Sequence, residues 1–113
     1  MQSELQISAR GLDLDERVET AIRLYAERLE RYHSRITAVR VAVEVPQRQM
    51  GAPIMYHVTF NIVLPQGEVV IRRQAHPNLL TAIQRAWEAA RRRLQDFARR
   101  QRHEVKVTSY GQS

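Results

Sequence analysis

The sequence contains no cysteine, few glycines and prolines, and no long hydrophobic run. Without thiols the chain cannot form disulfides, bind zinc through thiolates or use a cysteine nucleophile. No apolar stretch is long enough to cross a bilayer. The opening residues Met1-Gln2-Ser3-Glu4 lack the basic and apolar regions of a secretory signal. We therefore expect a cytoplasmic protein with no membrane partner.

Patterns typical of enzymes and metal sites are missing as well. The glycines are scattered, so there is no glycine-rich phosphate loop, and no two histidines have the spacing of metal ligands on a helix. No serine stands in a nucleophile-elbow context. Asp13, Asp15 and Glu16 are better explained as residues that start a helix than as an acid and base pair. The sequence predicts a protein with no catalytic residues, metal, cofactor or small-molecule substrate.

What the chain does have is the composition of one globular domain with an uneven charge. Its 113 residues are 43% hydrophobic and 27% charged, a balance found in folded single domains. The net charge is +6. Residues 1–78 hold 10 Arg against 9 acidic residues, whereas residues 79–113 hold 7 Arg and one Lys against 3 acidic residues. Such one-sided basic charge favours a polyanion, either nucleic acid or an anionic membrane surface.

The order of secondary structure follows from two periodicities. Apolar and polar residues alternate over 5–9, 39–45 and 56–64, as in half-buried strands. After a tight turn at residues 65–67 the chain should return as a fourth strand over 68–75, so that the last two strands form a hairpin. Helical spacing predicts helices from Asp13 or Asp15 to about His33, and from Asn78 as N-cap to about Arg102. We expect an α+β fold, a β-α-β-β-β-α two-layer sandwich with two helices on one face of a four-stranded sheet. Residues 1–102 would form the domain and 103–113 a loosely ordered polar tail.

Arginine is concentrated on the last helix. Seven arginines lie between residues 85 and 102, and on a helical wheel Arg85, Arg92 and Arg99 fall on one line opposite the apolar stripe. The others flank this line, with Arg93 and Arg100 on one side and Arg91 and Arg102 nearer the other edge. Such a face can simply be solvated, or it can contact the phosphates of nucleic acid. The density of arginine favours the second interpretation.

Charge and aromatic residues elsewhere suggest fewer functional roles. Arg28 lies at one flank of the apolar stripe of the first helix, where it could join a basic groove between the helices or form a surface salt bridge. We expect the aromatic side chains to be core residues rather than base-stacking platforms, namely Tyr25, Tyr32, Tyr56, Phe60, Trp87 and Phe97.

Several segments resemble a known family. Residues 7–15 (ISARGLDLD), followed by Val18 and the segment 28–32 (RLERY), resemble the start of the ribosome hibernation promoting factors and ribosome-associated inhibitors, the S30AE family. The likeness continues through Ile36 and the valines of 39–45, and resumes at Ala82-Ile83 and the arginine run from Arg91. It spans about residues 5–102. It implies a fold similar to double-stranded RNA-binding domains, in the short form without the additional C-terminal domain through which long members pair ribosomes.

The resemblance also implies a partner and a surface. Family members bind the small ribosomal subunit in the channel used by messenger and transfer RNA, contact ribosomal RNA with basic residues of both helices, and so silence idle ribosomes. Arg28, Arg92 and Arg100 stand where the family carries Lys or Arg. The helical wheel alone adds Arg85, Arg93 and Arg99 to the expected RNA-binding set.

The chain departs from the family pattern in two places. Residues 78–84 (NLLTAIQ) replace the usual Asp-x-Tyr that precedes Ala-Ala-Ile-Asp, and Ala89 and Asp96 stand where basic residues are common. These departures keep an alternative open, in which a non-catalytic module of the same fold has lost the ribosome and its basic helix meets an acidic protein.

Overall fold

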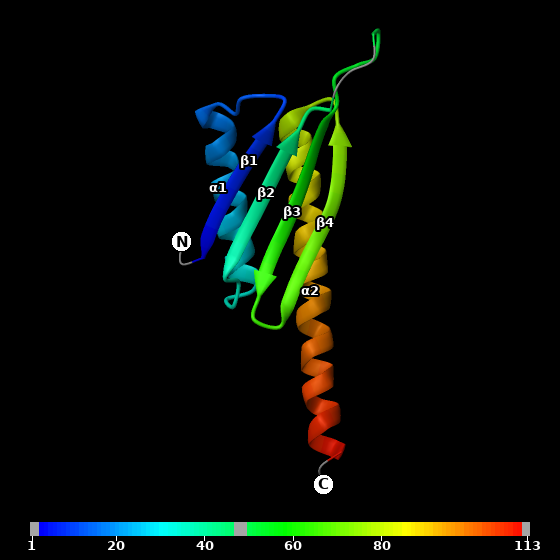
Figure 1. Ribbon diagram of the computed structural model, residues 1–113. Helices are drawn as coiled ribbons and strands as arrows, with labels where there is room; N and C mark the ends of the chain where they lie inside the picture. The colour runs from blue at the N-terminus through cyan, green and yellow to red at the C-terminus, as the bar shows by residue number, and fades with distance from the viewer. Residues whose placement is uncertain (1–2, 47–49, 112–113) are drawn as a thin grey trace.

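The structure is a computed structural model that describes residues 3–46 and 50–111, with the backbone alone for Arg73 and residues 101–111. Its elements are β1 (Glu4–Arg10), α1 (Glu16–Tyr32), β2 (Ala38–Glu44), β3 (Tyr56–Leu64), β4 (Gly67–His76) and α2 (Leu79–Gly111). Both helices cover one face of a single four-stranded sheet and the other face is open (Figure 1). The predicted α+β class and the β-α-β-β-β-α order are confirmed.

The sheet has the strand order β1-β2-β3-β4. β1 pairs with β2 in parallel, with Arg10 opposite Glu44, and the other two pairs are antiparallel. A parallel pair cannot be closed by a tight turn, and α1 is the crossover that joins β1 to β2. The register of β3 and β4 shifts between Val58 and Phe60, which marks a β-bulge.

The core fills the space between the sheet and the helices. Alternate strand residues and one stripe of each helix are buried, as the two periodicities predict. The largest of these side chains that are almost inaccessible to solvent are Phe60, Ile22, Leu29, Ile62, Ile83 and Leu94.

Short polar residues begin both helices. Asp15 is the N-cap of α1, where its Oδ1 accepts a hydrogen bond of 2.9 Å from the backbone N–H of Val18. The Oδ1 of Asn78 accepts one of 3.0 Å from the backbone N–H of Thr81. These contacts satisfy backbone donors that have no partner within the first turn of a helix. The cap expected at Asn78 is confirmed, and Asp15 rather than Asp13 caps α1.

One glycine is required by the path of the chain after β1. Gly11 has a φ of +83°, and a Cβ atom built there would lie 2.5 Å from the carbonyl oxygen of Val45. The same turn is held by a 2.9 Å hydrogen bond from the Val45 N–H to the Arg10 carbonyl oxygen. Glycine adopts this conformation without strain and has no Cβ atom that would clash with Val45. Gly11 therefore allows the ends of β1 and β2 to lie close together.

The second helix is longer than the sequence suggested. It continues to Gly111, so the expected end near Arg102 was wrong. Neither glycine nor proline occurs between Arg102 and Gly111, so no strong stop signal interrupts the helix there. Figure 1 shows α2 running well past the ends of the strands. Among the described residues no helix is long and apolar enough to cross a membrane.

Candidate nucleic-acid interface

The second helix has one buried face and one arginine face. Ala82, Ile83, Ala86, Ala90 and Leu94 are buried against the sheet and α1. The α2 arginines of the expected RNA-binding set are all exposed, namely Arg85, Arg92, Arg93, Arg99 and Arg100. Packing of the apolar stripe therefore forces the cations outward. The side chain of Arg102 lies outside the described part of the chain.

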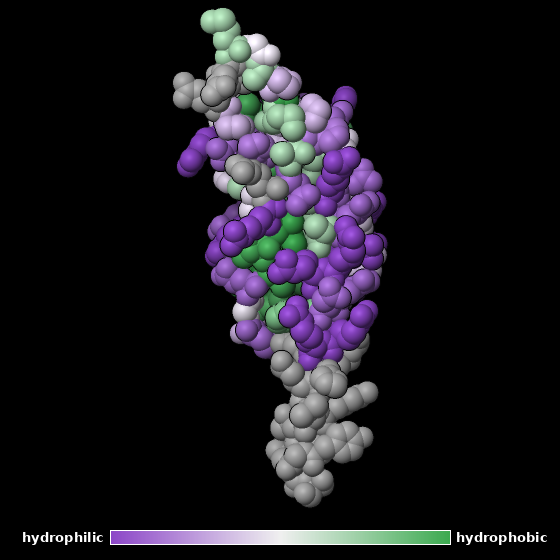
Figure 2. Space-filling model, turned by 90° about the vertical axis from the view of Figure 1, so that its right-hand side faces the viewer, coloured by the Kyte–Doolittle hydropathy of each residue, from purple (hydrophilic) through white to green (hydrophobic). Residues whose placement is uncertain are grey.

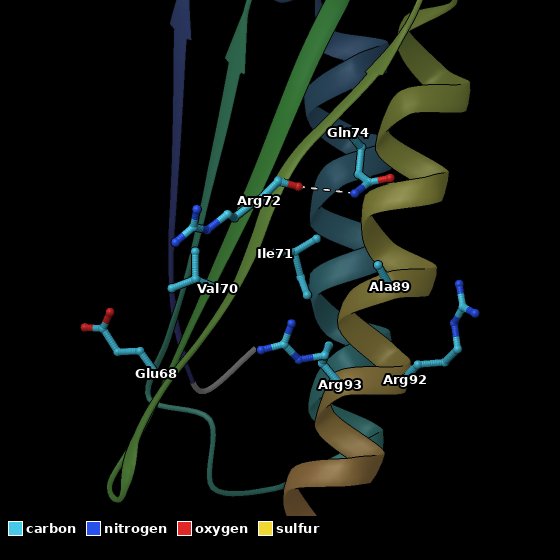
Figure 3. A pocket seen from close by; sticks show the side chains of 8 residues that line it. All are labelled: Glu68, Val70, Ile71, Arg72, Gln74, Ala89, Arg92 and Arg93. Atoms are coloured by element: carbon cyan, nitrogen blue, oxygen red, sulfur yellow. Dashed lines mark hydrogen bonds between the residues drawn. The ribbon is translucent and has the colours of Figure 1, made fainter.

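Two of these arginines line a groove between α2 and β4. Its volume is about 720 Å³. Figure 3 shows Arg93 reaching from α2 toward β4 and Arg92 pointing away from the strand. Seen from this side, apolar surface is visible within a ring of hydrophilic side chains (Figure 2). The residues that line the groove are Glu68, Val70, Ile71, Arg72, Gln74, Ala89, Arg92 and Arg93.

The electrostatics of this groove suit an anion. Three arginines line it and a single carboxylate, Glu68, opposes them. Guanidinium groups present planar donors that match phosphate oxygens. Ala89 contributes only a methyl group to the wall. This small side chain leaves open space beside Arg92 and Arg93.

Arg28 lies apart from this groove, on α1. Its Cζ atom is 5.6 Å from the ring centroid of Tyr25, one turn earlier on the same helix. Arg91 of α2 has a similar environment, with its Cζ 5.8 Å from the Tyr32 ring and 6.0 Å from the Trp87 ring. The structure thus places the predicted residues in two groups. The arginines of α2 share its outer face, and Arg28 stands beside the contact between the helices.

The aromatic residues are less buried than the sequence suggested. Phe60 is fully buried, as expected. Tyr25, Tyr56, Trp87 and Phe97 are partly buried and pack against the edge of the core. The expectation that Tyr32 belongs to the core was wrong, because 49% of this residue is exposed. Helical spacing places Tyr32 on the apolar stripe and does not predict this exposure. Tyr32 is the last residue of α1, where the apolar stripe of the helix is no longer covered by other elements.

The open face of the sheet differs from the arginine face of α2 in its charge and in its lack of described aromatic side chains. Its described side chains include three acidic and three basic residues, namely Glu4, Glu44, Glu68, Arg10, Arg40 and Arg72. None of its described side chains is Phe, Tyr or Trp, because Tyr56 and Phe60 face the core. Proteins that bind single-stranded RNA on a sheet stack bases on aromatic side chains there. The described side chains of this face therefore provide neither the rings nor the net positive charge for that role.

One histidine near the end of α1 has an altered titration. Partial burial lowers the pKa of His33 below its ordinary value of 6.5, and the positive charge of Arg35 lowers it further. The His33 Nδ1 also accepts a 3.3 Å hydrogen bond from the backbone N–H of Arg35. Among the residues that the structure describes, no three His, Asp or Glu side chains are placed to hold a metal ion.

Comparison with known proteins places this chain in a family. Residues 5–102 match the family described as Sigma 54 modulation protein / S30EA ribosomal protein. The chain belongs to this family. The S30EA match confirms the resemblance seen in the sequence and covers all four strands, α1 and α2 as far as Arg102. Membership in this family indicates a ribosome-associated modulation factor. No curated protein matched the sequence of this S30EA member.

Two solved structures share the fold of this S30EA protein. A ribosomal subunit interface protein from Coxiella burnetii has a TM-score of 0.72 at 10% identity, over 84% of this chain and 97% of the other. The N-terminal domain of Protein Y from Thermus thermophilus has a TM-score of 0.70 at 18% identity, over 86% of this chain and 99% of the other. At these identities the likeness establishes the architecture alone.

Proposed function

We propose that this protein is a hibernation factor that inhibits translation by binding ribosomal RNA of the small ribosomal subunit, in the channel used by messenger and transfer RNA. The observation that carries the proposal is the arginine face of α2 in a chain of the S30EA family. The protein would act by occupying the channel, without catalysis or a cofactor, in the cytoplasm of cells whose ribosomes are idle.

The proposed contacts are phosphate contacts. They would be made by Arg85, Arg92, Arg93, Arg99 and Arg100 of α2, and by Arg28 of α1. A row of guanidinium groups on a straight helix can follow a phosphate backbone and release its counterions. Binding of this kind depends on the shape of the RNA and hardly on its sequence, because side chains cannot read the deep, narrow major groove of an A-form helix and instead contact phosphates and 2′-hydroxyls. The groove beside Arg92 and Arg93 would accept a backbone bulge next to the helix.

Two variants with equal loss of charge test the location of the contact. The helix-face variant replaces Arg85, Arg92 and Arg99 by Ala. The sheet-face variant replaces Arg10 and Arg40 on the open face of the sheet and the exposed Arg17 of α1 by Ala, and so removes the same three charges without changing α2 or the residues that line the groove.

Sedimentation with purified ribosomes in sucrose gradients gives the readout. We expect the wild type and the sheet-face variant to migrate with the small subunit at low salt, and the helix-face variant to stay at the top. Equal loss in both variants would show that net charge and not the α2 face governs binding. If the wild type fails to migrate with ribosomes at low salt, the proposal is wrong. A nuclease-resistant complex from a lysate would then favour the alternative, an acidic protein partner of α2.

A further inference from the structure

A row of cations and aromatic rings crosses the contact between the two helices. We call it the interhelical strip, and it consists of Arg28, Tyr25, Trp87, Arg91 and Tyr32. The ring centroids of Tyr25 and Trp87 are 5.3 Å apart, and those of Tyr32 and Trp87 are 6.5 Å apart. Arg28 lies over Tyr25 at one side, and Arg91 is close to both Trp87 and Tyr32 at the other.

The inner part of the strip is fixed and its outer part is accessible. The indole Nε1 of Trp87 donates a 3.0 Å hydrogen bond to the Tyr25 carbonyl oxygen, which holds the indole ring in one orientation. Arg91 is half-buried beside two rings, whose π faces favour a cation. Tyr32 is 49% exposed. A partly solvated surface of rings and guanidinium, held at its centre by the fixed indole, therefore remains after the helices have packed.

Further basic side chains border the strip on α2. Arg91 is followed in the chain by Arg92 and Arg93, which belong to the arginine face and line the groove. The open face of the sheet offers no described Phe, Tyr or Trp for stacking. Basic side chains beside aromatic rings are the combination by which proteins hold single-stranded nucleic acid. Bases stack both on aromatic rings and on the plane of Arg side chains.

We propose that the interhelical strip binds one unpaired nucleobase of RNA, stacked on Tyr32 and the guanidinium plane of Arg91. Arg28 and Arg92 would contact the phosphates on either side of that nucleotide. A base within a duplex has both its faces covered by its neighbours, so the strip selects a nucleotide in a loop, a bulge or a single strand. This inference rests on the proposed RNA binding and adds a preference for unpaired nucleotides to it.

The only tryptophan of the chain makes the strip observable, because Trp87 stands at its centre. Its fluorescence can be followed during titration with a single-stranded ten-residue adenylate RNA, whose bases are unpaired, and with an abasic oligomer that has the same length and number of phosphates. Stacking of one base should make the adenylate oligomer bind about 5- to 100-fold more tightly than the abasic one. It should also change the Trp87 emission in a way that the abasic oligomer does not.

Two substitutions locate the effect. Tyr32→Leu removes a ring from an exposed position, and Arg91→Lys keeps the charge but loses the guanidinium plane. Each should abolish most of the preference for adenylate over the abasic oligomer. Arg17→Lys, which makes the same change at an exposed position of α1 outside both the strip and the proposed phosphate contacts, should preserve that preference. The two strip substitutions act at separate positions, so misfolding of one, detected by circular dichroism, leaves the other as the test.

The outcomes separate this inference from the proposed function. If the wild type migrates with ribosomes but binds adenylate and abasic oligomers equally, the strip does not stack a base and the phosphate contacts of α2 stand. A preference that survives both strip substitutions would overturn the inference as well. If the protein binds neither ribosomes nor either oligomer, RNA binding itself is wrong, and the strip is a packing contact between α1 and α2.

Discussion

The indole N–H of Trp87 donates a hydrogen bond of 3.0 Å to the backbone carbonyl oxygen of Tyr25, and this bond joins the middle of α2 to α1. Trp87→Phe keeps an aromatic ring but removes the donor. We expect the free energy of unfolding to fall by about 1 kcal/mol, the usual net value of one such hydrogen bond. Urea unfolding followed by circular dichroism measures the loss. Tyr25→Phe leaves the carbonyl oxygen in place and should cost less, so an equal loss in both variants would argue against the hydrogen bond as the cause.

Asp15 stabilises the start of α1 through its side chain. Asp15→Ala leaves the Val18 N–H without its 2.9 Å partner, and we expect a loss of about 0.5–2 kcal/mol in the free energy of unfolding. Asp13→Ala is the matched control, since Asp13 carries the same charge two residues earlier and is not the N-cap. Chemical denaturation of both variants measures the two losses in the free energy of unfolding, and the loss for Asp15→Ala should be the larger. Equal losses would mean that the acidic charge near the helix start matters and the capping bond does not.

Gly11 and Gly51 have the same φ of +83° but different surroundings. Alanine at either position is strained by about 1–3 kcal/mol. At Gly11 the new Cβ would also meet the Val45 carbonyl oxygen at 2.5 Å, whereas at Gly51 nothing lies within 4 Å. We expect Gly11→Ala to lower the melting temperature clearly more than Gly51→Ala. A smaller effect at Gly11 would show that the turn between β1 and α1 can shift without cost.

The lowered pKa of His33 makes stability depend on pH. Burial, and then the charge of Arg35, disfavours the protonated imidazole in the folded state. Between the ordinary pKa of 6.5 and the lower folded pKa, the unfolded chain therefore binds more protons, and stability falls as the pH falls through this window. His33→Gln should flatten that decline while leaving the stability curve above pH 6.5 parallel to that of the wild type. The midpoint of His33 in an NMR titration should lie below 6.5, and a midpoint at or above 6.5 would contradict the assignment.

The salt dependence of ribosome binding should report the number of phosphates contacted. Each arginine that contacts a phosphate contributes about 0.7–0.9 to the slope of log affinity against log salt concentration. The helix-face variant should therefore have a slope shallower by roughly 2 to 3. The sheet-face variant has the same net charge and should keep the wild-type slope. Binding measured between about 50 and 200 mM salt covers the informative range. Identical slopes for the two variants would speak against phosphate contacts by α2.

Much of the fold could be predicted because it depends on local patterns. The alternating valines of β2, the hairpin of β3 and β4 and the cap at Asn78 each follow from a few adjacent residues. The exposure of the arginines on α2 followed in the same way from the position of its apolar stripe. The extension of α2 beyond Arg102 was missed because weak helix formers carry no stop signal and give no definite end.

The arrangement between the helices could not be predicted, because it depends on their relative position. Tyr32 and Trp87 look like stripe residues when each helix is considered alone. Only packing at the contact between α1 and α2 shows that Arg91 lies near both rings and that Tyr32 remains half exposed. The groove beside Arg93 likewise depends on the path of α2 along β4. The spacing of residues in the sequence does not indicate how far Arg91 lies from the two rings or how far α2 lies from β4.

The parallel pairing of β1 with β2 has a consequence for the order in which the protein folds. β2, β3, β4 and α2 follow one another along the chain, and each strand of this part pairs with its successor. β1 instead has to pair across the whole of α1, and closing that longer loop costs entropy before any contact repays it. The segment from β2 to α2 can therefore collapse as a folding nucleus, with β1 and α1 docking late. The contact between the helices, with Trp87 and Tyr32, would be among the last parts to assemble and among the first to open.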